Sequence, residues 1–270
     1  MNYQALEFER RGAIGLLTLN RPERLNALSL ELAGELRDVF DNLRDDFQTR
    51  VVIIQGKGRA FCAGLDLTEA QAIISSEHEL GNVQYAYQTI QQALADIVVL
   101  MRHAPQPLIA AVRGPAAGGG FSIALACDIR IAGESARFNA AFIKVGLSGC
   151  DMGSSYHLPR MIGSSRAAEY LLTGRFMDAS TAERFGLVSQ VVPDDQVEAT
   201  TLELAHEMLL TSPFGLRITK ETLYQNISAP SLESAIHLEN RTQALGLLTE
   251  DFKEGLSAFV EKRSPIFHDR

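Results

Sequence analysis

Short apolar runs and longer amphipathic stretches follow one another along the first two thirds of the chain. The runs have the length and apolar content of buried strands: residues 6–11, 13–19, 51–55, 108–112 and 129–132. Behind Ser29, a favourable N-cap, apolar residues recur at helical spacing from Leu30 to Leu43. A second helix is expected over residues 84–102, ended by the prolines that follow it. The repeated order of strand, turn and helix predicts an α/β fold in which stacked βα turns share a parallel sheet.

Other parts of the chain carry weaker patterns. Residues 69–83 have mixed polarity and predict a mobile loop or lid. Residues 138–159 contain several glycines and are expected to be rich in loops. From Ser164 onward helices are expected to dominate, interrupted by a strand at 187–192 and closed by a helix at 251–263.

The strand at 108–112 runs into three consecutive glycines, Gly118 to Gly120, and an Ala-rich helical pattern follows them. Three glycines at this point predict a tight backbone that another group approaches closely. The free N–H groups of a helix start favour an anion, either a phosphate or the oxyanion of an acyl group. A second small-residue segment, Ala63-Gly64-Leu65, leaves another strand. The two segments either converge on one carbonyl oxygen or are tight turns where helices pack on the sheet.

Composition narrows the class of protein. A chain of 270 residues with 46% hydrophobic and 21% charged residues is expected to form one large domain, or one domain with a helical appendage. The net charge of −8 argues against nucleic acid as the main ligand, but permits a local basic pocket for one phosphorylated ligand. Three cysteines without paired or metal-ligand spacing predict reduced, small buried side chains in a cytoplasmic protein. No secretory signal is expected, because residues 1–11 carry Glu7 and Glu9 and have the pattern of a strand, and no apolar run is long enough to span a bilayer.

Six segments, in order along nearly the whole chain, carry recognisable motifs: residues 20–28, 61–67, 114–128, 171–174, 182–188 and 259–263. Taken together, they resemble the crotonase (enoyl-CoA hydratase/isomerase) superfamily. The resemblance implies a crotonase-like spiral of ββα turns in residues 1–195. It implies a helical region in residues 196–270 that covers coenzyme A and forms a trimer or a dimer of trimers. The implied substrate is an acyl-CoA thioester, with coenzyme A entering as part of the substrate and with no separate cofactor or metal.

The resemblance places the two oxyanion donors on the backbone N–H groups of Leu65 and Gly119. Such fixed donors stabilise the developing enolate more than the ground state. Arg24 and Arg59 match residues that contact the CoA phosphates, and Lys262 matches a lysine that reaches CoA on a neighbouring subunit. For these three the alternative is a solvated surface charge. The full set of implied substrate contacts is Arg24, Ala27, Arg59, Ala63, Gly64, Asp66, Leu67, Gly118, Ser122, Phe142 and Lys262.

The main departure from the family lies in the acids. Ser122 and Phe142 stand where hydrating members carry two glutamates, so water addition by two carboxylates is not expected. Asp151 falls where dienoyl-CoA isomerases and an aryl-CoA dehalogenase have a catalytic Asp. Burial near Phe142 and Met152 would raise its pKa and make it a base. The alternative role is to cap the helix that begins near Ser154; we prefer catalysis.

The sequence therefore predicts an acyl-CoA-processing enzyme of isomerase or hydratase type, with Asp151 as acid and base. One alternative is an acyl-CoA-binding protein that lost catalysis with the two glutamates. Another is a thioester or C–C hydrolase, in which Ser122 is the nucleophile and His157 and Asp151 are its partners.

Overall fold

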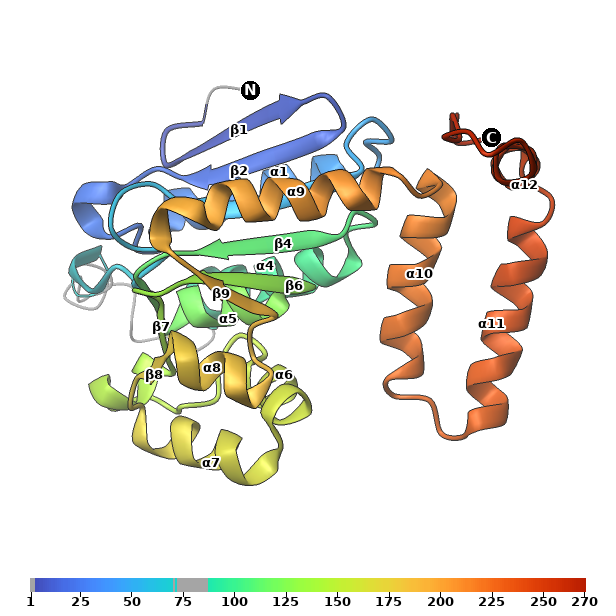
Figure 1. Ribbon diagram of the computed structural model, residues 1–270. Helices are drawn as coiled ribbons and strands as arrows, with labels where there is room; N and C mark the ends of the chain where they lie inside the picture. Colours follow the sequence, from blue (N-terminus) through green and yellow to red (C-terminus); the bar gives the residue numbers. More distant parts are fainter. Residues whose placement is uncertain (1–2, 70, 72–86) are drawn as a thin grey trace.

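The computed structural model describes residues 3–69, 71 and 87–270 (Figure 1). The larger sheet of this described part has the strand order β1-β2-β3-β4-β6-β9. Its strands are β1 (Leu6–Arg11), β2 (Ile14–Leu19), β3 (Val51–Gly56), β4 (Leu108–Val112), β6 (Ile129–Gly133) and β9 (Gln190–Val192). β1 is antiparallel to β2, and every other pairing in this sheet is parallel. The parallel sheet expected from the apolar runs is confirmed.

A second, narrower ladder runs alongside this sheet. It contains β5 (Pro115–Ala117), β7 (Arg137–Asn139) and β8 (Met177–Asp178). Two isolated parallel bridges continue it, one between Cys62 and Ala116 and one between Leu28 and Leu65. Each turn of the chain thus adds one strand to the large sheet and one segment to the ladder before its helix. The predicted α/β spiral of ββα turns is confirmed.

Helices cover both faces of the large sheet. α1 (Leu30–Leu43), α4 (Gln92–His103) and the wholly buried α5 (Gly119–Ala126) enclose the larger core. α9 (Val197–Leu209) crosses the other face in Figure 1 and closes the smaller core. Within β3, Val52 and Ile54 point into the first core and Val51 and Ile53 into the second, as the strand period of two requires.

Three stretches with weak sequence patterns are described to different extents by the structure. The lid predicted at 69–83 falls almost entirely outside the described residues. The predicted helix at 84–102 is described from residue 87, where a π-helical turn, η2 (Tyr87–Gln91), leads into α4. The stretch 138–159 is more helical than expected, because α6 (Ser154–Ile162) begins directly after Gly153 and includes Pro159. α6 packs against α5 and against α7 (Ser164–Thr173), and this tertiary packing maintains a helix whose interior proline removes one N–H donor.

The remaining short elements connect the layers. They are η1 (Pro22–Arg24), η3 (Ala141–Val145), α8 (Ala179–Phe185) and η4 (Asp194–Gln196).

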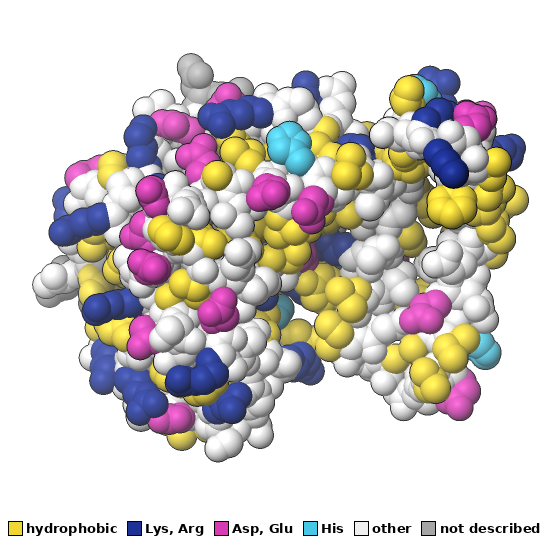
Figure 2. Space-filling view, viewed as in Figure 1, with side chains coloured by type: hydrophobic (Ala, Val, Ile, Leu, Met, Phe, Trp, Pro, Cys, Tyr) yellow, Lys and Arg dark blue, Asp and Glu magenta, His cyan; other side chains and the backbone are white. Residues whose placement is uncertain are grey.

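The chain ends in three helices, here called the C-terminal arm: α10 (Pro213–Asn226), α11 (Leu232–Gly246) and α12 (Glu250–Glu261). Figure 1 shows α11 and α12 beyond α10, on its side remote from the sheet. Large apolar side chains of the arm are exposed, with Leu248 at 79% and Phe259 at 83%, and Figure 2 shows hydrophobic side chains along it. The predicted boundary at 195/196 precedes α9, which packs on the sheet, and trimerisation through the arm stays a prediction. Within the described ranges, no helix is both long and apolar enough to cross a membrane.

Candidate active site

The two small-residue segments named from the sequence lie side by side. Gly64 carbonyl and Asp66 N–H both hydrogen-bond to the backbone of Leu28, at N···O distances of 2.7 and 2.9 Å. Since backbone groups alternate in direction along an extended segment, the N–H of Leu65 points away from Leu28. On that other side, Cys62 pairs with the strand that leads to Gly118 and Gly119. The fold therefore brings Leu65 and Gly119 to one place.

Glycine is required where these segments touch. Gly64 adopts φ +92°, and a Cβ added there would lie 2.8 Å from the carbonyl oxygen of Ala117 and 3.3 Å from the backbone nitrogen of Gly119. A Cβ on Gly120 would lie 2.2 Å from the carbonyl oxygen of Cys62. The close approach predicted from the triple glycine is thus an approach of backbone to backbone.

Neither the N–H of Leu65 nor that of Gly119 donates a hydrogen bond to any other described residue. Gly119 is the first residue of α5, where the helix dipole adds a partial positive charge. Two such donors are able to bind one oxygen that carries negative charge.

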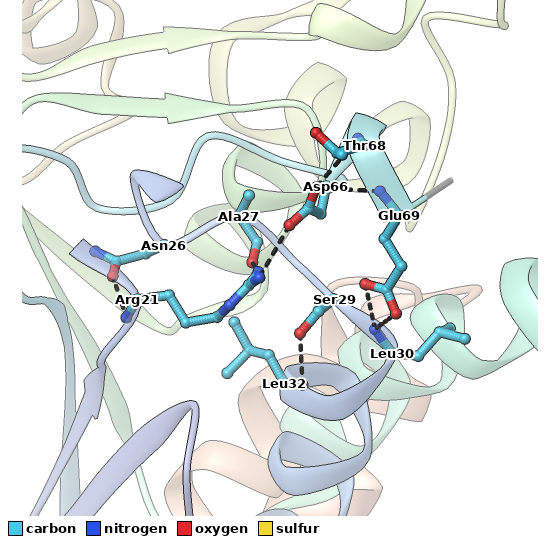
Figure 3. A network of polar contacts seen from close by, with 9 residues as sticks. All are labelled: Arg21, Asn26, Ala27, Ser29, Leu30, Leu32, Asp66, Thr68 and Glu69. Carbon is cyan, nitrogen blue, oxygen red and sulfur yellow. Dashed lines mark hydrogen bonds and ion pairs between the residues drawn. The ribbon is translucent and has the colours of Figure 1, made fainter. Parts of the chain in front are cut away.

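A polar network sets the position of the Leu65 segment (Figure 3). The guanidinium of Arg21 forms an ion pair with Asp66 at 2.9 Å and also donates to the carbonyl of Ala27. The Asp66 carboxylate accepts the N–H groups of Thr68 and Glu69, at 3.1 and 3.3 Å. Burial alone would raise the pKa of Asp66, but the Arg21 contact and these two N–H donors outweigh it and lower the pKa.

The sequence did not predict that the side chains of Arg21 and Asn26 hold these loops together. The side chain of Asn26 is fully buried, accepts the N–H of Arg21, and donates to the carbonyls of Lys57 and Ala60 at 2.9 and 2.8 Å. Asn26 therefore connects the loop after β2 to the loop after β3. Arg21 and Asn26 both lie in the polar Asn20–Leu28 loop, where the proline indicated a turn but no charge pattern indicated these contacts.

Asp151 lies next to the start of α5. The sulfur of Met152, the following residue, is 3.2 Å from the position of a Cβ on Gly119. The Asp151 carboxylate accepts the N–H of Met152 at 2.7 Å and a hydrogen bond from the side chain of Gln91. Burial raises the pKa of Asp151, and these two donors oppose that effect without cancelling it. The N-cap of α6 is Gly153 and no side chain caps that helix, so Asp151 does not fill the alternative role of helix cap.

Ser122 and Phe142 line the same region. The Ser122 hydroxyl, on α5, is buried and donates to the backbone carbonyl of Asp151 at 3.1 Å. The Phe142 ring lies 3.5 Å from a Cβ position on Gly118. Among the described residues, Ser122 and His157 do not form a hydrogen bond with each other. Burial, together with the charges of Arg102, Arg130 and Arg160, lowers the pKa of His157 to about 4. The geometry does not assemble the nucleophile and base of a serine hydrolase.

The residues expected to contact coenzyme A are divided between two regions. Arg24, at the end of η1, and Arg59, after β3, are exposed on loops that Asn26 joins. Ala27 is buried and Ala63 half-buried beside them. Lys262 is exposed at the end of α12, remote from this loop pair in Figure 1. The chain by itself does not bring Lys262 to the site, and its role stays a prediction, as do the other substrate contacts.

The cysteine prediction is partly wrong. Cys62 and Cys127 are buried, and burial raises the pKa of each thiol to about 12. Cys150 is exposed, because it lies in the loop before α6 rather than in a tight buried segment. Across the described residues, no group of three or more His, Cys, Asp or Glu is arranged to hold a metal ion.

Comparison with known proteins identifies the family of this chain. Residues 9–270 match the family described as Enoyl-CoA hydratase/isomerase. A protein of Mycobacterium bovis named a probable enoyl-CoA hydratase is 42% identical over 260 residues, which is 96% of this chain and 90% of the relative. The 1,2-epoxyphenylacetyl-CoA isomerase of Escherichia coli K12 is 37% identical over 253 residues, 93% of each chain. The crystal structure of an enoyl-CoA hydratase from Bacillus anthracis is similar with a TM-score of 0.92 and 33% identity, covering 99% of this chain and all of that one.

The chain belongs to the enoyl-CoA hydratase/isomerase family, the crotonase superfamily, and is an enzyme of that family.

Proposed function

We propose that this enzyme binds an acyl-CoA thioester and holds its carbonyl oxygen on the N–H groups of Leu65 and Gly119. That oxygen gains negative charge when the α-proton leaves, so two fixed donors stabilise the transition state more than the bound substrate. The absence of any other acceptor for these two groups among the described residues supports the assignment. Losing one such donor typically raises the barrier by about 2.7–4 kcal/mol.

We infer further that Asp151 is the acid and base and that the reaction is an isomerisation. The observation that carries this inference is a half-buried carboxylate with a raised pKa beside the start of α5, in a site where Ser122 and Phe142 replace the two hydratase glutamates. One carboxylate is sufficient to take a proton from one carbon and return it to another. Hydration needs a second group to activate water. Relatives bear both hydratase and isomerase names, so family membership alone does not decide between these reactions.

Coenzyme A would lie along the loops that carry Arg24 and Arg59, with Ala27 and Ala63 as apolar walls of its path. In the proposed trimer, Lys262 reaches the phosphates of CoA bound to a neighbouring subunit. No cofactor is needed, because proton transfer next to a thioester uses only a carboxylate and the oxyanion donors.

The test is deuterium exchange at the α-carbon of a saturated acyl-CoA in deuterated water. We expect exchange by the wild type and its loss in Asp151→Asn, while Asp45→Asn, at an exposed aspartate after α1, exchanges normally. Tight binding of acyl-CoA with no exchange by the wild type would contradict the proposal. That outcome would leave an acyl-CoA-binding protein.

A further inference from the structure

Gln91 contacts the proposed catalytic carboxylate from a distant part of the chain. It is the last residue of the π-helical turn η2 and lies 60 positions before Asp151. Its side-chain amide N–H donates to Oδ1 of Asp151. Wide π turns occur often at functional sites, because they move a side chain out of the regular helical row. Nothing in the family resemblance pointed to this residue.

The other contacts of Asp151 hold its backbone or come from its own neighbour. The Ser122 hydroxyl donates to the Asp151 carbonyl at 3.1 Å, and the Asp151 N–H donates to the Ser154 hydroxyl at 3.0 Å. Met152 N–H donates to Oδ1 at 2.7 Å. Among the described residues, Gln91 is the one side chain that donates a hydrogen bond to the carboxylate itself.

The two donors to the carboxylate share one oxygen. Gln91 and the Met152 N–H both donate to Oδ1, and no described residue donates to Oδ2. An oxygen that already accepts two hydrogen bonds is the poorer proton acceptor. The proton taken from substrate therefore goes to Oδ2. An amide does not titrate, so it keeps this arrangement at every working pH.

We propose that Gln91 is a positioning residue that fixes Oδ1 of Asp151 and leaves Oδ2 to carry the transferred proton. This inference rests on the proposed function, in which Asp151 is the acid and base. It predicts that Gln91 sets both the orientation of the carboxylate and the pH at which the carboxylate becomes a base.

Other titratable groups near Asp151 have to be separated from this effect. Cys150 is the exposed neighbour in the same loop, and His157 lies one turn into α6. Burial lowers the pKa of His157 to about 4, so this side chain is neutral at pH values well above 4. Lys144 on η3 and Arg160 on α6 are further basic side chains, and α5 contributes no ionisable side chain. A Cys150→Ser background removes the thiol from the pH profile, and His157→Gln in the same background separates the titration of His157 at the acid end.

The experiment measures the pH profile of α-proton exchange in that background for Gln91→Leu, Gln91→Glu and Gln92→Leu. Removing the donor makes the carboxylate a stronger base, so the acid-side midpoint for Gln91→Leu should rise by about one pH unit, with a lower plateau. A second carboxylate beside Asp151 should move the midpoint of Gln91→Glu further upward. Gln92, the next residue, is exposed and forms no hydrogen bond with Asp151, so Gln92→Leu should match the wild type.

The outcomes separate the two proposals. If Gln91→Leu lowers the plateau of the exchange rate but leaves the midpoint of its pH profile unchanged, Gln91 has a merely structural role and this inference is overturned. The proposed function would then still stand, provided that exchange depends on Asp151. Full exchange by Asp151→Asn would instead remove the proposed function and this inference with it. Thermal melting of each variant checks folding, which an exposed position such as Gln91 should not disturb.

Discussion

Gly120→Ala is the sharpest test of how the fold positions the two proposed donors. The added Cβ would lie 2.2 Å from the carbonyl oxygen and 2.6 Å from the Cβ of Cys62, and that oxygen also accepts the N–H of Ala117. An ordinary contact begins near 3.4 Å, so α5 and the Cys62 segment must separate by about 1 Å. The Cys62 segment continues into Leu65, so this separation moves one proposed donor away from the other.

Two quantities should respond to this change. Overpacking of a tight core typically destabilises by about 1–3 kcal/mol. A misplacement of about 1 Å at a reacting centre lowers the rate by roughly a hundredfold. We therefore expect Gly120→Ala to melt at a lower temperature, and its folded fraction to exchange α-protons about a hundredfold more slowly than the wild type.

Two matched glycines serve as controls. Gly34 is exposed on α1 with open space at its Cβ position, so Gly34→Ala should gain about 1 kcal/mol of stability and exchange normally. The Cβ of Gly119→Ala would meet the ends of flexible side chains, Leu28 Cδ1 at 2.6 Å and Met152 Sδ at 3.2 Å. Its melting temperature and exchange rate should therefore fall between those of Gly120→Ala and Gly34→Ala. Wild-type exchange by folded Gly120→Ala would refute the argument that contact between the segments sets the donors.

Three further predictions concern buried and perturbed groups. Lys220 on α10 is buried and lies 3.0 Å from Asp128, so Lys220→Met should lower the free energy of unfolding by about 3 kcal/mol in urea, and Lys220→Arg by less. The pKa of His157 is lowered to about 4 from 6.5, so the unfolded chain binds the proton more strongly between these values. The free energy of unfolding should therefore fall as the pH drops from 6.5 towards 4, and urea titrations of His157→Gln should show a smaller fall. The pKa of Asp66 is lowered in the folded state, so its ionised carboxylate stabilises the fold at neutral pH. This stabilisation is lost as the pH falls through the lowered pKa. Asp66→Asn should remove about 2 kcal/mol near pH 7 and slow α-proton exchange, because the Arg21 ion pair no longer holds the Leu65 segment.

Local patterns were sufficient where an element is long or has a clear boundary. Short apolar runs located β1 to β4. The N-cap Ser29 and the helical spacing behind it located α1, and the Ser29 hydroxyl accepts the N–H of Leu32 at 3.1 Å. β5 and β7 have three residues each and β8 has two, which is too short for any period to show. They were therefore not expected.

Pairings between distant residues could not be found in the same way. Arg21 and Asp66 are 45 positions apart, and Gln91 and Asp151 are 60 apart. Each pair forms because separate turns of the spiral are stacked. The local sequence around either residue does not predict its partner. The family resemblance named Leu65, Gly119 and Asp151, whereas the side chains that hold them in place came only from the three-dimensional arrangement.

The proposed donors belong to the main chain, and this has a consequence for how such a site diverges. Every residue type except proline carries a backbone N–H, so proline is the one substitution at positions 65 and 119 that deletes the donor itself. The side chains at 91, 122, 142 and 151 are free of that constraint. A descendant of this chain is thus able to exchange its acids and change its reaction while thioester binding persists, so that the anchoring of the substrate and the fate of its proton are inherited separately.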